Sequence, residues 1–150
     1  MSNPAPHDPL LAASMREMSR AHIADTWRRG RKGEPLSQED VAFYRAMLDH
    51  PEYVDFWEHA AELGDKEINA DGVNPFLHIS LHSVLERQIE DQDPPETAQA
   101  LFRLTRGGLD RHEALHCIAS VLAEFMQQLV HQANPPGLDV YRRRLRMLQP

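Results

Sequence analysis

Two pairs of histidines have the spacing that places both side chains on one face of a helix. His112 and His116 stand in the motif His-Glu-Ala-Leu-His, and His78 and His82 form a second pair with the same spacing. Residues i and i+4 of a helix lie one turn apart on the same side. Each pair could therefore direct two imidazole rings at one cation, as the H-E-x-x-H helix of zinc enzymes does. Two such pairs on facing helices would surround one point with four nitrogen donors.

A set of imidazoles at this spacing is typical of a transition-metal site, because imidazole nitrogen suits zinc, iron, nickel and copper. The expected cofactor is a divalent transition metal, with zinc and iron as the main candidates. Glu86 lies one turn after His82 and is the best candidate for a carboxylate ligand. Glu113 occupies the position of the general base in a metalloprotease helix. The predicted metal ligands are His78, His82, His112, His116 and Glu86, and the candidate catalytic residue is Glu113.

The sequence leaves the chemistry of such a site open between a metal-dependent hydrolase and a redox protein. A metalloprotease is disfavoured, because the segment after His116 lacks the glycine and histidine of the extended protease motif. A di-iron carboxylate bundle needs two Glu-x-x-His pairs, and Glu113 with His116 forms the only one. A histidine-rich di-iron site of the hemerythrin type is an alternative, built from His82, Glu86, His112 and His116. Four histidines filling a tetrahedron would instead make a structural site.

A second hypothesis, from another class, needs no metal. Nine histidines in 150 residues give roughly half an i, i+4 pair by chance, so one pair alone would mean little. In this reading the protein is a helical interaction or dimerisation module. Its paired histidines then pack at the edge of the core or form hydrogen bonds. The remaining histidines are expected at the surface or at helix ends: His7, His22, His50, His59 and His131.

The composition indicates a globular protein without a basic face. The chain is 41% hydrophobic and 26% charged, and its net charge of -7 argues against a nucleic-acid partner. No apolar run approaches the roughly 18 residues of a membrane span, and residues 1–8 do not form a signal peptide. The single cysteine, Cys117, fits a reducing compartment. We therefore expect a cytoplasmic protein that binds neither nucleic acid nor membrane, with a homodimer as one expected assembly and no substrate indicated.

Apolar spacing and helix-breaking residues predict an all-α fold. Residues 1–8 are expected to be flexible, and residues 9–150 to form a single domain. The expected bundle has about six to seven helices, and the two long histidine-bearing helices form a central antiparallel pair. No segment alternates as a strand does. The helices are predicted at about 9–29, 37–48, 51–64, 75–90, 96–106, 111–132 and 138–148.

The same spacing predicts which helix faces are buried. In the 75–90 helix the expected buried stripe is Leu77, Leu81, Val84 and Leu85, with the histidines at its edge. In the 111–132 helix the expected stripe is Leu115, Ile118, Leu122, Phe125 and Leu129. Phe102 is expected to be buried in the shorter helix between them.

The motifs that carry the histidines also resemble those of a numbered bacterial family. The segment Asn-Pro-Phe-Leu-His at 74–78, continued through His82, and the segment His-Glu-Ala-Leu-His at 112–116 resemble the domain-of-unknown-function family 1841. The resemblance covers roughly residues 25–148, including the turn at His50-Pro51. It implies a small helical bacterial protein and brings no assigned activity. The family's motif residues correspond to His78, His82, His112, Glu113 and His116.

Overall fold

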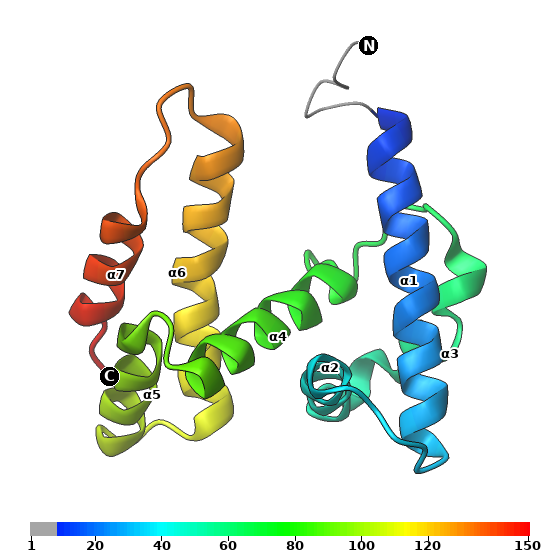
Figure 1. Ribbon diagram of the computed structural model, residues 1–150, viewed down its shortest axis with the longest axis horizontal. Helices are drawn as coiled ribbons and strands as arrows, with labels where there is room; N and C mark the ends of the chain where they lie inside the picture. Colours follow the sequence, from blue (N-terminus) through cyan, green and yellow to red (C-terminus); the bar gives the residue numbers. More distant parts are fainter. Residues whose placement is uncertain (1–8) are drawn as a thin grey trace. The chain divides into compact units, whose positions relative to one another are not determined.

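The computed structural model describes residues 9–150, with side chains described at Arg16 and from Met18 onward. These residues form seven α-helices and two short 3-10 helices and contain no strand; one isolated bridge pairs Ala70 with Val73 (Figure 1). The predicted all-α fold is therefore confirmed. The helices are α1 (Pro9–Arg31), α2 (Gln38–Leu48), η1 (Pro51–Tyr53), α3 (Val54–Glu58), η2 (Ala60–Leu63), α4 (Pro75–Asp91), α5 (Pro95–Arg106), α6 (Arg111–His131) and α7 (Leu138–Met147).

Helix starts follow the capping residues of the sequence. Ser37 Oγ accepts a hydrogen bond from the Asp40 backbone N–H at the start of α2. Asn74 Oδ1 accepts from the Phe76 and Leu77 N–H groups at the start of α4, at 3.0 and 3.2 Å. Because the first N–H groups of a helix lack partners within the helix, such acceptors define where it begins.

The prediction of one helix over residues 51–64 is wrong. The segment is divided into η1, α3 and η2. Its middle, from Tyr53 to Trp57, is mostly aromatic or β-branched, and these residue types have low helix propensity. The segment ends at Gly64, whose φ of 57° favours glycine.

The chain divides into two compact units. The single domain over residues 9–150 stays a prediction. The first unit ends at Ile79 and the second runs from Ser80 to Pro150. The boundary falls inside α4, so one continuous helix belongs to both units. Each unit has a hydrophobic core of its own.

The core of the first unit is built around aromatic side chains. Trp27 of α1, Trp57 of α3 and Phe76 of α4 are buried there, together with Ile23, Met47, Ala60 and Ile79. The Trp57 and Phe76 rings pack edge to face, with centroids 5.7 Å apart. Helix α1 packs against α2, α3 and η2, so the short helices after α2 are held by contacts with distant residues.

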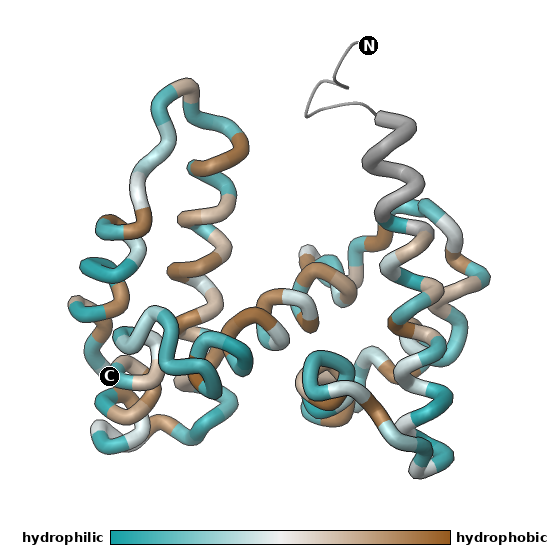
Figure 2. Tube along the Cα trace, in the orientation of Figure 1, coloured by the Kyte–Doolittle hydropathy of each residue, from teal (hydrophilic) through white to brown (hydrophobic). Residues whose placement is uncertain are grey.

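The core of the second unit lies between α4, α5, α6 and α7. Leu115, Ile118, Leu122 and Phe125 of α6 are buried, as predicted, and apolar residues recur along this helix (Figure 2). Leu129 is exposed, against the prediction. The last turns of α6 extend past α7, so no neighbouring helix of this unit covers them (Figure 1).

The predicted buried stripe of α4 is partly wrong. Leu77 and Val84 are exposed, whereas Phe76, Ile79 and His82 are buried. Phe76 and Ile79 belong to the core of the first unit, and Leu85 belongs to that of the second. Because α4 serves two cores in succession, its buried face is not the single leucine stripe that the spacing predicted.

Phe102 of α5 is exposed as well, contrary to its prediction. The buried residues of this helix are Glu96, Thr97, Ala100 and Leu104. The Arg106 guanidinium lies over the Phe102 ring, 5.6 Å from its centroid. The aromatic side chain thus contacts an arginine of its own helix rather than the core.

A buried carboxylate links α5 to α7 in the second unit. Glu96 is only 5% exposed and accepts hydrogen bonds from Arg142 Nε at 3.0 Å and Arg146 Nη1 at 2.9 Å. The bond from Arg142 holds the pKa of the Glu96 carboxyl below its usual value, against the opposing effect of burial. The charged form of Glu96 is therefore the form that stabilises this contact.

We expect the Glu96→Gln variant to lose about 1–2 kcal/mol of unfolding free energy, since charge-assisted hydrogen bonds are replaced and the two arginines are partly exposed. A lowered pKa means that the unfolded chain binds the proton more readily. The stabilisation is present above the ordinary glutamate pKa of 4.5 and is lost as the pH falls through the folded-state value. Urea unfolding from pH 7 to pH 3 should show a smaller loss of stability in the variant. Equal pH dependence in both proteins would contradict this assignment.

Candidate metal centre

Three histidines from two helices meet within the second unit. His82 of α4 lies 5.1 Å from His116 and 5.6 Å from His112 of α6, and the latter two are 4.2 Å apart, measured between ring centroids. His82 is only 2% exposed. With metal–nitrogen bonds of about 2.0–2.1 Å, imidazoles around one tetrahedral ion have ring centres roughly 5 Å apart. The three rings are therefore close enough to one another to form a candidate metal-binding group.

A pair of histidines lies within the first unit. His50 is 1% exposed, and its Nε2 lies 2.9 Å from Nε2 of His78. His50 Nδ1 lies 2.7 Å from the Ala46 carbonyl oxygen. A carbonyl only accepts hydrogen bonds, so Nδ1 carries the proton, and in the neutral ring the lone pair is on Nε2. This nitrogen faces His78 Nε2, from which it can accept a hydrogen bond.

His50 lies at a helix end, as expected, because it is the N-cap residue of η1; its ring is buried, so the expectation of a surface position is wrong. It follows α2 and precedes a proline, and no other histidine lies four residues away. Folding brings it to His78, which is 28 residues later in the chain. The one sequence feature that pointed to His50 was the His50-Pro51 turn, which is part of the resemblance to the family. Residue spacing could not reveal it.

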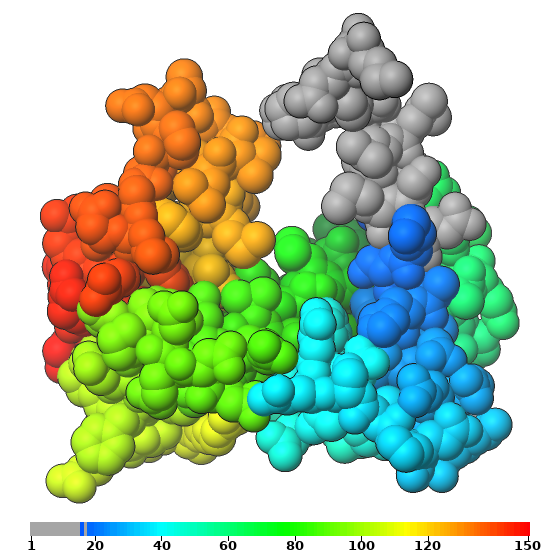
Figure 3. Space-filling model, in the orientation of Figure 1, coloured from blue at the N-terminus to red at the C-terminus, as the bar shows by residue number. Residues whose placement is uncertain are grey.

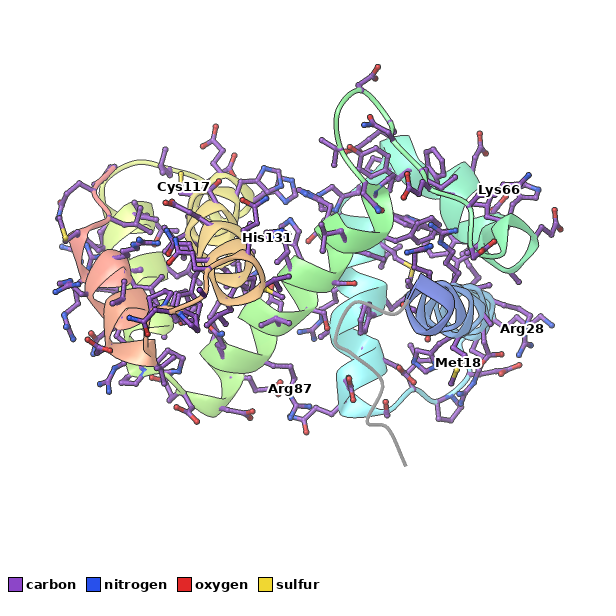
Figure 4. The ribbon with its side chains drawn as sticks, turned by 90° about the horizontal axis from the view of Figure 1, so that it is seen from above. Met18, Arg28, Lys66, Arg87, Cys117 and His131 are labelled. Atoms are coloured by element: carbon purple, nitrogen blue, oxygen red, sulfur yellow. The ribbon has the colours of Figure 1, made fainter. Side chains whose placement is uncertain are left out.

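Helix α4 carries His78, which pairs with His50, and His82, which lies beside His112 and His116. These two residues are one turn apart on the helix. His50 and His78 belong to the first unit, and His82 and His116 to the second. His112, the other predicted histidine ligand, stacks on His82 in the second unit with an interplanar angle of 8°. Cys117 follows His116 but is exposed on α6 (Figure 4).

Glu86, the predicted carboxylate ligand, forms an ion pair with the first residue of α6. Its two oxygens accept from Arg111 Nη1 at 2.7 Å and Nη2 at 2.8 Å. His82 contacts His116 and His112, whereas Glu86, later on α4, contacts Arg111, which is earlier on α6. The two helices are therefore antiparallel. To ligate a metal, Glu86 would have to leave this guanidinium.

Glu113, the candidate catalytic residue, takes part in a capping box at the start of α6. Its carboxylate accepts from the Asp110 backbone N–H at 3.0 Å, and Asp110 Oδ1 accepts from the Glu113 N–H at 2.8 Å. Both bonds satisfy backbone donors at the helix end. The carboxylate thus has a structural role in addition to its position beside His112.

Asp110→Ala should lower the stability of the protein by about 1 kcal/mol, because it removes the cap of α6. Glu113→Gln should change it by less than about 0.5 kcal/mol, since glutamine also completes a capping box. Urea unfolding followed by circular dichroism measures both. A large loss of stability in Glu113→Gln would show that the negative charge itself is needed, which is not expected from an exposed cap.

No helix among the described residues is long and apolar enough to cross a membrane. The fold and the histidine cluster define a small all-α protein with a candidate metal centre. The chain belongs to the family described as a domain of unknown function, DUF1841, whose model matches residues 15–147. No curated protein and no solved structure matches the chain.

Proposed function

We propose that this protein binds a divalent transition metal ion through the imidazoles of α4 and α6. The observation that carries the proposal is the convergence of His82 with His112 and His116 within one compact unit. His78 precedes His82 by one turn of α4 but belongs to the first unit, so it is not part of the proposed set.

The proposed donor set consists of nitrogen atoms. The carboxylates nearest to it in the sequence, Glu86 and Glu113, are engaged with Arg111 and with the start of α6. Imidazole donors suit zinc, iron, nickel and copper, and zinc or iron is the metal that we propose. If three histidines bind the ion, a coordination position stays open for water or substrate, as in catalytic zinc sites; four histidines close the site. The number of ligands thus decides between a metal-dependent enzyme and a structural centre.

Elemental analysis of the untagged protein, purified without chelator, tests the proposal. We expect close to one zinc or iron per chain, falling to roughly a tenth or less in His82→Ala and His116→Ala, because each loses a donor that the remaining groups do not replace. His131→Ala is the matched control: this exposed histidine is the last residue of α6 and should keep the metal. Metal-free protein that is fully folded, or equal metal in all three variants, would overturn the proposal.

A second candidate is supported by a different feature of the second unit. The end of α6, orange in Figure 3, lies on the surface of the view. Met126, Leu129 and Val130 are exposed there, and residues 125–132 contain no acidic or basic side chain other than His131. Two copies of this uncharged apolar stripe could pack together without placing like charges opposite each other. In this alternative the protein is a dimerisation module.

Sedimentation equilibrium distinguishes the dimer from the monomer. We expect Val130→Glu to shift the protein to the monomer, since two buried carboxylates would repel each other. Met147→Glu, at another exposed apolar side chain of the same unit, is the control and should leave the assembly unchanged. A monomer at all concentrations in the unsubstituted protein would exclude this candidate and leave the metal proposal untouched.

A further inference from the structure

Beside the three histidines of the second unit, an arginine and a glutamate form a second link between α4 and α6. Arg111 directly precedes His112, and Glu86 lies one turn after His82. The Arg111 side chain is 52% exposed and Glu86 is 18% exposed. A guanidinium that meets a carboxylate through two parallel bonds has the geometry that recognises planar oxyanions.

We infer that the ligand of this centre is a small oxyanion, a carboxylate or phosphate group, bound between the metal ion and Arg111. The inference rests on the proposed function, because it requires an ion held by His82, His112 and His116. It deepens that proposal by naming the class of molecule that the centre takes.

The charge balance of the second unit supports an anionic ligand. Neutral imidazoles leave the ion with its full double positive charge. The carboxylate of Glu86 is neutralised by Arg111, and that of Glu113 accepts the Asp110 N–H. Neither compensates the ion while it keeps these partners. An added oxyanion would supply the missing negative charge and fill a coordination position that three histidines leave open.

The position of Glu86 indicates how the anion reaches Arg111. Glu86 already places a carboxylate on the guanidinium, which shows that the space in front of Arg111 accepts this group. An incoming oxyanion takes the same two donors in its place. Glu86 therefore competes with the ligand, and removing its charge should strengthen anion binding, while removing the Arg111 guanidinium should weaken it.

Cobalt(II) loaded into the full-length protein provides the probe, because its visible absorption changes when an anion enters the coordination sphere. We expect acetate or inorganic phosphate to change the spectrum with saturation. Arg111→Ala should weaken the apparent affinity at least about tenfold, and Glu86→Gln should raise it several-fold. Acetate as the stronger ligand assigns a carboxylate, and phosphate as the stronger ligand assigns a phosphate group; both outcomes support the inference.

Two further variants separate anion recognition from effects on folding. Arg111→Lys keeps the charge but loses the paired donors, and we expect an affinity between those of the unsubstituted protein and Arg111→Ala. Arg87→Ala is the matched control, because Arg87 projects outward from α4 and pairs with Asp91 at 3.5 Å (Figure 4). It should bind cobalt and anions as the unsubstituted protein does.

The outcomes that contradict the two proposals differ. Failure of the unsubstituted protein to take up cobalt, zinc or iron overturns the metal centre and, with it, the oxyanion site. Cobalt uptake with a spectrum that neither anion changes overturns the oxyanion site alone. Equal anion affinities in Arg111→Ala and Arg87→Ala would also overturn the oxyanion site alone.

Discussion

The packing of helix α4 is the constraint on which the rest of the structure depends. Its first turns place Phe76 and Ile79 in the core of the first unit, and a later turn places Leu85 in the core of the second. His78 and His82 lie between Phe76 and Leu85, one turn apart. Because the apolar contacts on both sides determine the rotation of the helix about its own axis, they also determine where the two imidazoles point.

The polar groups near the candidate centre form contacts that stabilise the fold. Glu86 joins α4 to α6 through Arg111, and Glu113 completes the cap of α6. His50 forms a bond to the carbonyl of Ala46 in α2. Such contacts hold the surrounding side chains and select ring tautomers, which is the role of supporting groups around metal sites. They also leave the imidazole nitrogens as the donors best placed for an ion.

The sequence predicts the helices better than it predicts which elements pack against each helix. Four α6 residues lie in the core as predicted, because this part of the helix has one well-defined apolar face packed on one set of partners: Leu115, Ile118, Leu122 and Phe125. Leu77 of α4 and Phe102 of α5 were assigned wrongly, since burial of a residue also depends on which element lies opposite it. Apolar spacing describes the face of one helix and carries no information about that opposite element.

The sequence by itself determined the helix starts at Ser37, Asn74 and Asp110 and the two i, i+4 histidine pairs, because capping and helical spacing act over one turn of the chain. Only the tertiary structure decided that His50 is buried against His78 and that Glu86 pairs with Arg111. These contacts join residues 25 or more positions apart. They form because packing of the two cores brings the helices together, and no local pattern in the chain encodes them.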